Sequence, residues 1–353
     1  MGVSGSCQRT HRASEQPGDG DRKRHNGDSS HRGPPPHSTQ PHTAFDQFSA
    51  SYCHLSLSAT IVSMRTSFTE LVGCRLPLQL AVLGGVGTVE LARAVEEAGG
   101  LGMVPRRVHV PEPRSGALGK GFLIPYLPPL EEVVEDVRGL RVAEFFWGEP
   151  QTEIVAAAHS VGSLASWQVG SGDEARAAEA AGCDLVVAQG VEAGGHVRGT
   201  QPLDELLEQV LAAVAVPVVA AGGVGSAERV AQLISAGADA VRVGTRFLAC
   251  PECDAHPEYV QALIAAGAGD TFLTDHFDAD GEWPAQVRVL RVSLEGAIGA
   301  GNRGSSPPGA TAEAPLTMAC YAGLSVEHVR AVEPASDVVR ELTSLLAWPA
   351  GAG

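Results

Sequence analysis

The sequence predicts an α/β protein: a TIM (β/α)8 barrel with a small C-terminal helical extension and a disordered N-terminal tail. After about residue 64, short apolar segments alternate with Ala-, Leu- and Glu-rich segments of helical pattern. Fully apolar strands that alternate with helices are typical of a parallel sheet covered by helices, and eight such strands favour closure into a barrel. A doubly wound open sheet is the alternative, because the second and third strands are weakly marked.

The predicted tail comprises residues 1–63, and residues 64–353 form the barrel domain with its C-terminal helical segment. The tail is rich in Gly, Pro, Ser, His, Arg and Asp. Such a composition buries too little apolar surface to offset the entropy of ordering. Its histidines lack the paired spacing of a metal site. At Met64 a capped amphipathic segment begins, and we hypothesise that Met64 is the biological first residue.

Eight segments have the pattern of strands: residues 78–83, 101–104, 122–125, 142–147, 164–169, 184–188, 216–220 and 240–243. Helical patterns are clearest in residues 88–98, 173–181, 203–214 and 227–236. These begin near Thr, Asp or Ser, which are suited to N-caps. Gly99, Gly182 and Gly237 follow three of them and are suited to left-handed C-caps.

The second βα unit is short and contains Pro105, Pro111 and Pro113. A regular helix cannot pass through these prolines. We therefore predict that the helix of this unit is shortened or missing.

Composition narrows the classes of function. The formal net charge of −16 disfavours nucleic acid and anionic membrane surfaces as partners. No segment approaches the roughly 20 apolar residues that a bilayer requires. The N-terminus lacks the apolar core of a secretory signal. Seven scattered cysteines do not form a disulfide framework. We expect a cytoplasmic protein that is a monomer or a homodimer.

The segments after the seventh and eighth strands predict a phosphate site. The seventh runs into Gly222 and Gly223, which precede a helix, and the eighth runs into Gly244, Thr245 and Arg246. Glycines let the backbone approach a phosphate, and a helix N-terminus offers unpaired N–H groups. In TIM barrels these two loops are the usual place for a phosphate. Arg246 is a further candidate donor.

A glycine-rich loop after the sixth strand carries the principal candidate for chemistry. It reads Gln189-Gly-Val-Glu-Ala-Gly-Gly-His196. Gln189 can donate to and accept from the edge of a heterocycle, and Gly194 and Gly195 allow close contact with a flat ligand. His196 can exchange protons near neutral pH. A solvated histidine on a surface loop is the alternative. Glu192 is either a general base or, as we favour, a residue that fixes the loop.

Two other features carry less weight. Cys250 and Cys253 have the Cys-x-x-Cys spacing, but no second pair or neighbouring histidine completes a metal site, and we favour two incidental thiols. His276 either enters the pocket from the C-terminal extension or lies on the surface. We predict no metal.

From Met64 to about Leu346 the sequence resembles the nitronate monooxygenase family, formerly called 2-nitropropane dioxygenases. The resemblance rests on the His196 loop, on Pro217-Val-Val-Ala-Ala-Gly-Gly223 and on Gly237-Ala-Asp-Ala-Val-Arg-Val-Gly-Thr-Arg-Phe247. Trp283-Pro284, the segment from Arg288 to Arg291, and Tyr321-Ala-Gly323 resemble C-terminal signatures of the family.

The resemblance implies an FMN-containing TIM barrel that oxidises alkyl nitronates with O₂. It implies that His196 is catalytic and that FMN contacts Gln168, Gln189, Gly194, Gly223, Arg242, Val243, Gly244 and Thr245. The sequence departs from the family in two places. Ala81-Val82-Leu83 stands where the family usually has Ala-Pro-Met, and Gly121 stands where it usually has Asn.

Two other functions fit the same residues. One is an NAD(P)H-dependent flavin reductase of the enoyl-thioester or quinone type, which would use the same fold and histidine loop. The other is a degenerate flavin-binding barrel without turnover, suggested by Gly121 and the short second unit.

Overall fold

The computed structural model describes residues 64–112, 116–277 and 285–346. The predicted tail and the signature residues Trp283-Pro284 lie outside these ranges. Eight parallel strands form the central sheet: β1 (Leu78–Leu80), β2 (Gly102–Pro105), β3 (Leu118–Leu123), β4 (Val142–Phe146), β5 (Leu164–Val169), β6 (Leu185–Gln189), β8 (Val218–Ala221) and β9 (Ala240–Val243).

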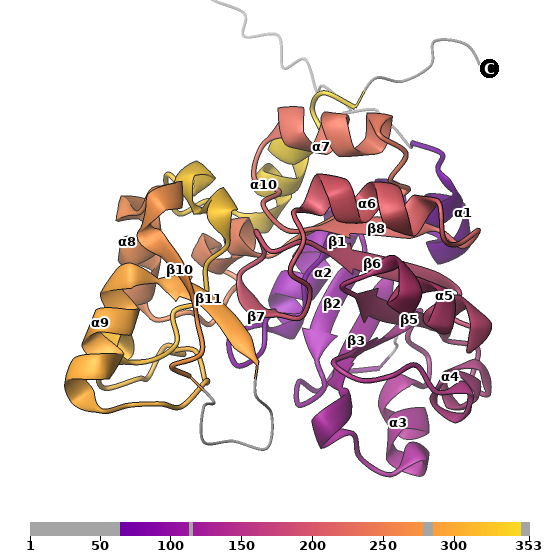
Figure 1. The fold of residues 1–353 in the computed structure, drawn as a ribbon, viewed down its shortest axis with the longest axis horizontal. Coiled ribbons are helices and arrows are strands. Elements are labelled where there is room, and N and C mark those ends of the chain that lie inside the picture. Colours follow the sequence, from indigo (N-terminus) through magenta and orange to yellow (C-terminus); the bar gives the residue numbers. More distant parts are fainter. Residues whose placement is uncertain (1–63, 113–115, 278–284, 347–353) are drawn as a thin grey trace, which may run out of the picture. The chain divides into compact units, whose positions relative to one another are not determined.

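The sheet closes into a barrel. Its strand order is β1-β9-β8-β6-β5-β4-β3-β2 (Figure 1). The two end strands meet through two backbone hydrogen bonds, from Leu80 N to Leu101 O at 2.9 Å and from Leu101 N to Leu78 O at 2.8 Å. The predicted TIM barrel is confirmed, and the open-sheet alternative is wrong.

Seven helices accompany the strands of the barrel along the chain: α1 (Ser67–Val72), α2 (Val89–Ala98), α3 (Leu130–Val137), α4 (Thr152–His159), α5 (Gly172–Ala180), α6 (Leu203–Leu211) and α7 (Ala227–Ser235). Three of the four helices with predicted caps have them, and the capping hydroxyls belong to Thr88, Ser171 and Ser226. The fourth, α6, begins after Pro202 and has no side-chain cap. Gly99, Gly182 and Gly237 have φ of 117°, 98° and 109°, so each helix ends at a residue that tolerates left-handed backbone. None of the helices in the described part of the chain is long and apolar enough to cross a bilayer.

Strand β3 begins at Leu118, whereas the sequence predicted a start at residue 122. The prediction missed the first half of the strand because that half does not have an apolar pattern. Lys120 interrupts it, yet this side chain is buried and its Nζ lies 3.1 Å from Asp136 Oδ1 on α3. A paired lysine can occupy a buried strand position that an unpaired one cannot.

The described residues between β2 and β3 contain no helix, as predicted from the prolines. Arg106, just after β2, instead connects this segment to α3. Its Nη2 lies 2.8 Å from Glu132 Oε2, and its Nε lies 3.1 Å from Asp136 Oδ2. Asp136 therefore pairs with both Arg106 and Lys120.

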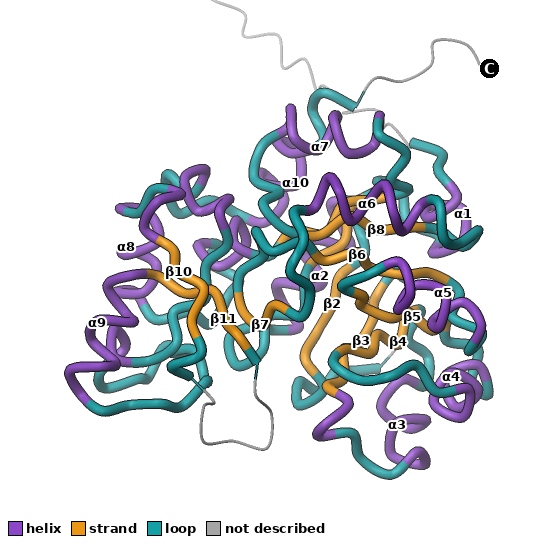
Figure 2. Tube along the Cα trace, viewed as in Figure 1, coloured by secondary structure: helices purple, strands orange, loops and turns teal. Residues whose placement is uncertain are grey.

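The C-terminal extension contains three helices, α8 (Pro257–Ala265), α9 (Arg291–Ala300) and α10 (Ala335–Leu342), and two strands that the sequence did not predict, β10 (Thr271–Thr274) and β11 (Gln286–Leu290). The 3₁₀ turns of the structure are η1 (Ile124–Tyr126), η2 (Thr245–Ala249), η3 (Ala268–Asp270), η4 (Pro315–Thr317) and η5 (Leu324–His328). Strand β11 pairs on one side with β10 and on the other with β7 (Gly195–Val197), a short strand in the histidine loop (Figure 2). Helix α10 returns to the barrel and packs against α2 and α7.

Side chains of the barrel strands alternate between two environments. Phe145 and Trp167 belong to the apolar core, with ring centroids 5.3 Å apart. On the other face lies a buried polar network. Arg242 Nη2 lies 2.8 Å from Glu144 Oε1, and its Nη1 donates to Gln168 Oε1 at 2.6 Å. Gln79 Nε2 donates to the other oxygen of Glu144 at 2.6 Å. The network therefore joins strands β1, β4, β5 and β9.

Breaking this network should destabilise the barrel strongly. Glu144→Ala leaves the buried guanidinium of Arg242 without its counter-charge, a change that typically costs about 3–5 kcal/mol. Glu144→Gln keeps an acceptor for Arg242 and should cost less. The free energy of unfolding in urea measures both effects. The control is Glu135→Ala, which removes an exposed partner of Arg138 and should change stability little. An effect of Glu144→Ala as small as that of Glu135→Ala would contradict the expectation.

Candidate active site

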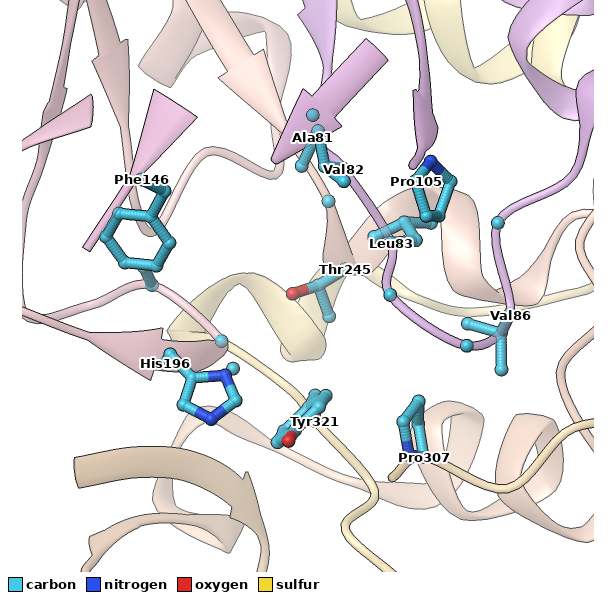
Figure 3. A pocket seen from close by; sticks show the side chains of 18 of the residues that line it. Ala81, Val82, Leu83, Val86, Pro105, Phe146, His196, Thr245, Pro307 and Tyr321 are labelled. Atoms are coloured by element: carbon cyan, nitrogen blue, oxygen red, sulfur yellow. The ribbon is translucent and has the colours of Figure 1, made fainter. Parts of the chain in front are cut away.

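A cavity of about 770 Å³ opens at the carboxyl ends of the barrel strands. Nearly all of the predicted site residues line it: Gln168, Gln189, Gly194, Gly195, His196, Gly222, Gly223, Arg242, Gly244 and Thr245. Val243 does not, since its buried side chain belongs to the apolar core. In Figure 3, Phe146 and His196 lie on one side of the cavity, and Pro105 and Val86 lie on the opposite side.

The two predicted phosphate loops form one wall. Gly222 and Gly223 have φ of 116° and 67°, a conformation that strains other residues, and their backbone lines the cavity directly. Helix α7 starts just beyond them, with Ser226 as its N-cap. The hydroxyl of Thr245 accepts from Gly323 N at 3.0 Å.

Arg246 does not take part in this wall, contrary to its candidacy as a donor. Its guanidinium turns away from the cavity, donating to Gly225 O at 2.7 Å and to Glu341 Oε2 of α10 at 2.6 Å. This ion pair lowers the pKa of the Glu341 carboxyl. Arg246 therefore joins α10 to the barrel.

The histidine loop is fixed by its own side chains. Gln189 Nε2 donates to His196 O at 3.0 Å, so this amide group is committed to the loop. Both carboxylate oxygens of Glu192 accept from Leu203 N, the first residue of α6, at 3.1 Å. Of the two roles considered for Glu192, the structure therefore supports that of fixing the loop.

The C-terminal extension fixes the loop from the other side. In the β7–β11 ladder His196 lies opposite Val287. The guanidinium of Arg288 donates to Val191 O at 2.8 and 3.1 Å, and Leu324 N donates to Glu192 O at 3.0 Å. His196 is thus carried by a short strand, and not by a solvated surface loop.

The imidazole of His196 is half-buried and lies between the loops after two barrel strands and the C-terminal extension. Its centroid lies 5.7 Å from that of Tyr321 and 6.4 Å from that of Trp147, which directly follows β4. Figure 3 shows His196 and Tyr321 as neighbours at the cavity. The side chain therefore lines the cavity with aromatic rings as its neighbours.

Sequence reasoning gave no role to two residues in or beside the cavity wall. Glu144 lines the cavity beside Gln168 and Arg242, and its charge within an apolar strand pattern was overlooked. Trp147 was placed in a strand without a role. A charged residue inside a predicted buried strand is the signal that could have identified Glu144.

Val82 and Gly121, which belong to the two segments where the sequence departs from the usual family pattern, lie against each other. A Cβ atom added at Gly121 would lie 2.5 Å from Cγ2 of Val82, so the isopropyl group of Val82 occupies the space of a side chain at position 121. Both residues line the cavity.

The remaining candidates lie outside the cavity. Cys250 and Cys253 are unpaired by disulfides, and burial raises the pKa of Cys253 to about 12, so these thiols are protonated at neutral pH. The ring Nε2 of His276 lies 2.9 Å from Asn302 O. Within the described ranges, no three His, Cys, Asp or Glu side chains gather as they would around a metal ion.

Comparison with known proteins places this geometry in a family. The family model described as nitronate monooxygenase matches residues 130–296. A nitronate monooxygenase of Pseudomonas aeruginosa is 33% identical over 60% of this chain and 77% of its own. A (3aS,4S,5R,7aS)-5-hydroxy-7a-methyl-1-oxo-octahydro-1H-indene-4-carboxyl-CoA dehydrogenase of Mycobacterium tuberculosis is 29% identical over 68% and 70%. The solved nitroalkane oxidase of Streptomyces ansochromogenes superposes with a TM-score of 0.64 at 28% identity, covering 80% of this chain and 98% of its own. The chain belongs to the nitronate monooxygenase family.

Proposed function

We propose that this oxidoreductase is an FMN-dependent nitronate monooxygenase, which oxidises alkyl nitronates with O₂ and releases the nitro group. The observation that carries the proposal is the convergence of His196 and two glycine loops on one cavity at the carboxyl ends of the strands. Family membership implies a flavin, a small-molecule substrate and O₂.

The residues of the cavity fit a flavin. Nε2 of Gln168 is buried without a hydrogen-bond partner, and the residue lines the cavity. A buried donor of this kind is costly unless a ligand accepts from it, and the ring of a flavin carries suitable acceptors. The backbone of Gly222, Gly223 and Gly244, together with the N-terminus of α7, would hold one phosphate.

His196 would bind the substrate and move its proton. A nitronate carries its negative charge on the nitro oxygens, and a ring N–H of His196 would hold them. With a neutral nitroalkane, an unprotonated ring nitrogen of His196 would first accept the α-proton. A bound flavin supplies the electron acceptor for the substrate and the electron donor for O₂. Tyr321 and Phe146 would exclude water from this side of the cavity.

A reductase is the second candidate, because a relative of similar coverage is described as a carboxyl-CoA dehydrogenase. Such an enzyme would draw its electrons from NAD(P)H and use the same flavin cavity. The degenerate barrel is less well supported, since the unpartnered Nε2 of Gln168 still fits a ligand.

FMN, rather than FAD, should co-purify with the protein. The cavity offers one glycine-lined phosphate cradle, at Gly222 and Gly223 with Gly244 after the neighbouring strand β9, which matches one phosphate. Mass spectrometry of the cofactor released by heat identifies it, and FAD would overturn this expectation.

Nitronates should drive O₂ uptake, whereas NAD(P)H should not reduce the flavin quickly. The assay compares O₂ consumption with propionate 3-nitronate against anaerobic loss of flavin absorbance with NADH and NADPH. Rapid bleaching without nitronate turnover would establish the reductase. A protein that binds flavin but shows neither reaction would establish the degenerate barrel.

Replacing His196 should affect the turnover of neutral nitroalkanes more than that of preformed nitronates. His196→Asn keeps hydrogen-bonding ability but removes the base, and loss of general acid–base help costs about 10²–10⁴-fold in rate. We expect bound FMN to be retained, turnover of neutral nitroalkanes to fall by this factor, and preformed nitronates to suffer less. His276→Asn, outside the cavity, is the matched control. Equal, near wild-type rates on both forms would remove His196 from the mechanism.

A further inference from the structure

Trp147 has an unusual backbone conformation. Its φ is 66°, and among the described residues it is the only one other than glycine with positive φ. Bulky side chains are disfavoured there because Cβ crowds the backbone. Such strain persists only where the surroundings enforce it, and it is found most often at functional sites.

The neighbouring residues hold this conformation in place. Strand β4 ends at Phe146, whose ring meets that of Trp147 edge-on with centroids 5.4 Å apart. On the other side, Gly148 O accepts from the indole N–H of Trp167 at 3.1 Å. A side chain at position 148 would lie 2.5 Å from Ile124, so the chain passes through a tight space here.

The indole ring of Trp147 is directed at strand β7. The guanidinium carbon of Arg198 lies 5.7 Å from the ring centroid, and the imidazole of His196 lies 6.4 Å from it at an interplanar angle of 71°. Arg198 is itself held, with its Nε 2.7 Å from Glu174 Oε1. The ring therefore packs against His196 of β7 and against Arg198 just beyond the strand, and Glu174 fixes Arg198.

We infer that Trp147 is a positioning residue: its left-handed backbone places the indole against His196, which with Tyr321 holds the imidazole in one orientation toward the cavity. The inference rests on the role proposed above for His196. Trp147 itself does not line the cavity, so it would act through the histidine.

Three substitutions separate strain from ring contact. Trp147→Ala removes the ring and keeps the strained Cβ, Trp147→Gly removes both, and Trp147→Phe keeps an aromatic ring. We expect Trp147→Gly to melt at a higher temperature than Trp147→Ala, because only glycine tolerates φ of 66° without strain. An equal or lower melting temperature for the glycine variant would refute the strain.

The restraint on the His196 imidazole is tested without turnover, by the rate at which diethyl pyrocarbonate modifies it in the protein as purified. Mass spectrometry localises the label, and His276, held by Asn302 O, is the internal reference. We expect His196 to react several-fold faster in the alanine and glycine variants, an unchanged rate at His276, and near wild-type behaviour in Trp147→Phe. An unchanged rate at His196 in both smaller variants would overturn the inference.

The rate of turnover then shows whether the position of the His196 imidazole matters for the reaction. Small misplacements of a reacting group can cost up to about 100-fold in rate. We expect kcat on neutral nitroalkanes to fall about 10- to 100-fold in the alanine and glycine variants, with KM little changed and with rescue by phenylalanine. If the wild-type protein does not turn over nitronates, the proposed function fails, while the modification rates still decide whether Trp147 positions His196.

Discussion

The pairing of β7 with β11 is the constraint on which the arrangement of the site depends. The loop after β6 contains glycines at positions 190, 194, 195 and 199, and fixing backbone costs about 1–2 kcal/mol per residue, most for glycine. The loop's own side chains, Gln189 and Glu192, provide only part of the hydrogen bonding that offsets this cost. Strand β11 supplies the ladder, and Arg288 binds Val191 O. The barrel therefore provides the position of His196, and the C-terminal extension provides its rigidity.

The arginines around the cavity also depend on partners from distant segments of the chain. Three arginines line it, and two are neutralised: Arg242 by Glu144 below, and Arg106 by Glu132 and Asp136. Arg107 is exposed at the rim. Because Glu144 neutralises the buried guanidinium of Arg242, this arginine is not a free anion site. An anionic ligand would therefore be held mainly by backbone N–H groups and His196.

The sequence predicted what depends on local pattern and missed what depends on distant pairing. Strands β5 and β9, the glycine C-caps and the absent second helix follow from apolar runs, glycines and prolines, and all were predicted correctly. Strand β3 was placed too late, because Lys120 needs Asp136 of α3 to be buried. Strand β7 was not predicted, because its partner lies some 90 residues further on. Of the cavity lining, the glycine loops and His196 were predicted from their places after the strands, whereas Glu144 pairs with residues of distant strands, which no motif encodes.

The contact between Val82 and Gly121 bears on whether the barrel has lost its function. Random loss of a side chain at position 121 would leave a void beside β1, and voids in packed proteins are costly. Here the isopropyl group of Val82 fills that space, so a larger residue at 121 would collide with it. The two differences from the usual family sequence thus form one packed unit, which keeps the cavity wall continuous. Decay would not be expected to produce matched partners, and the packing of Val82 against Gly121 is better understood as an apolar variant of this part of the cavity wall.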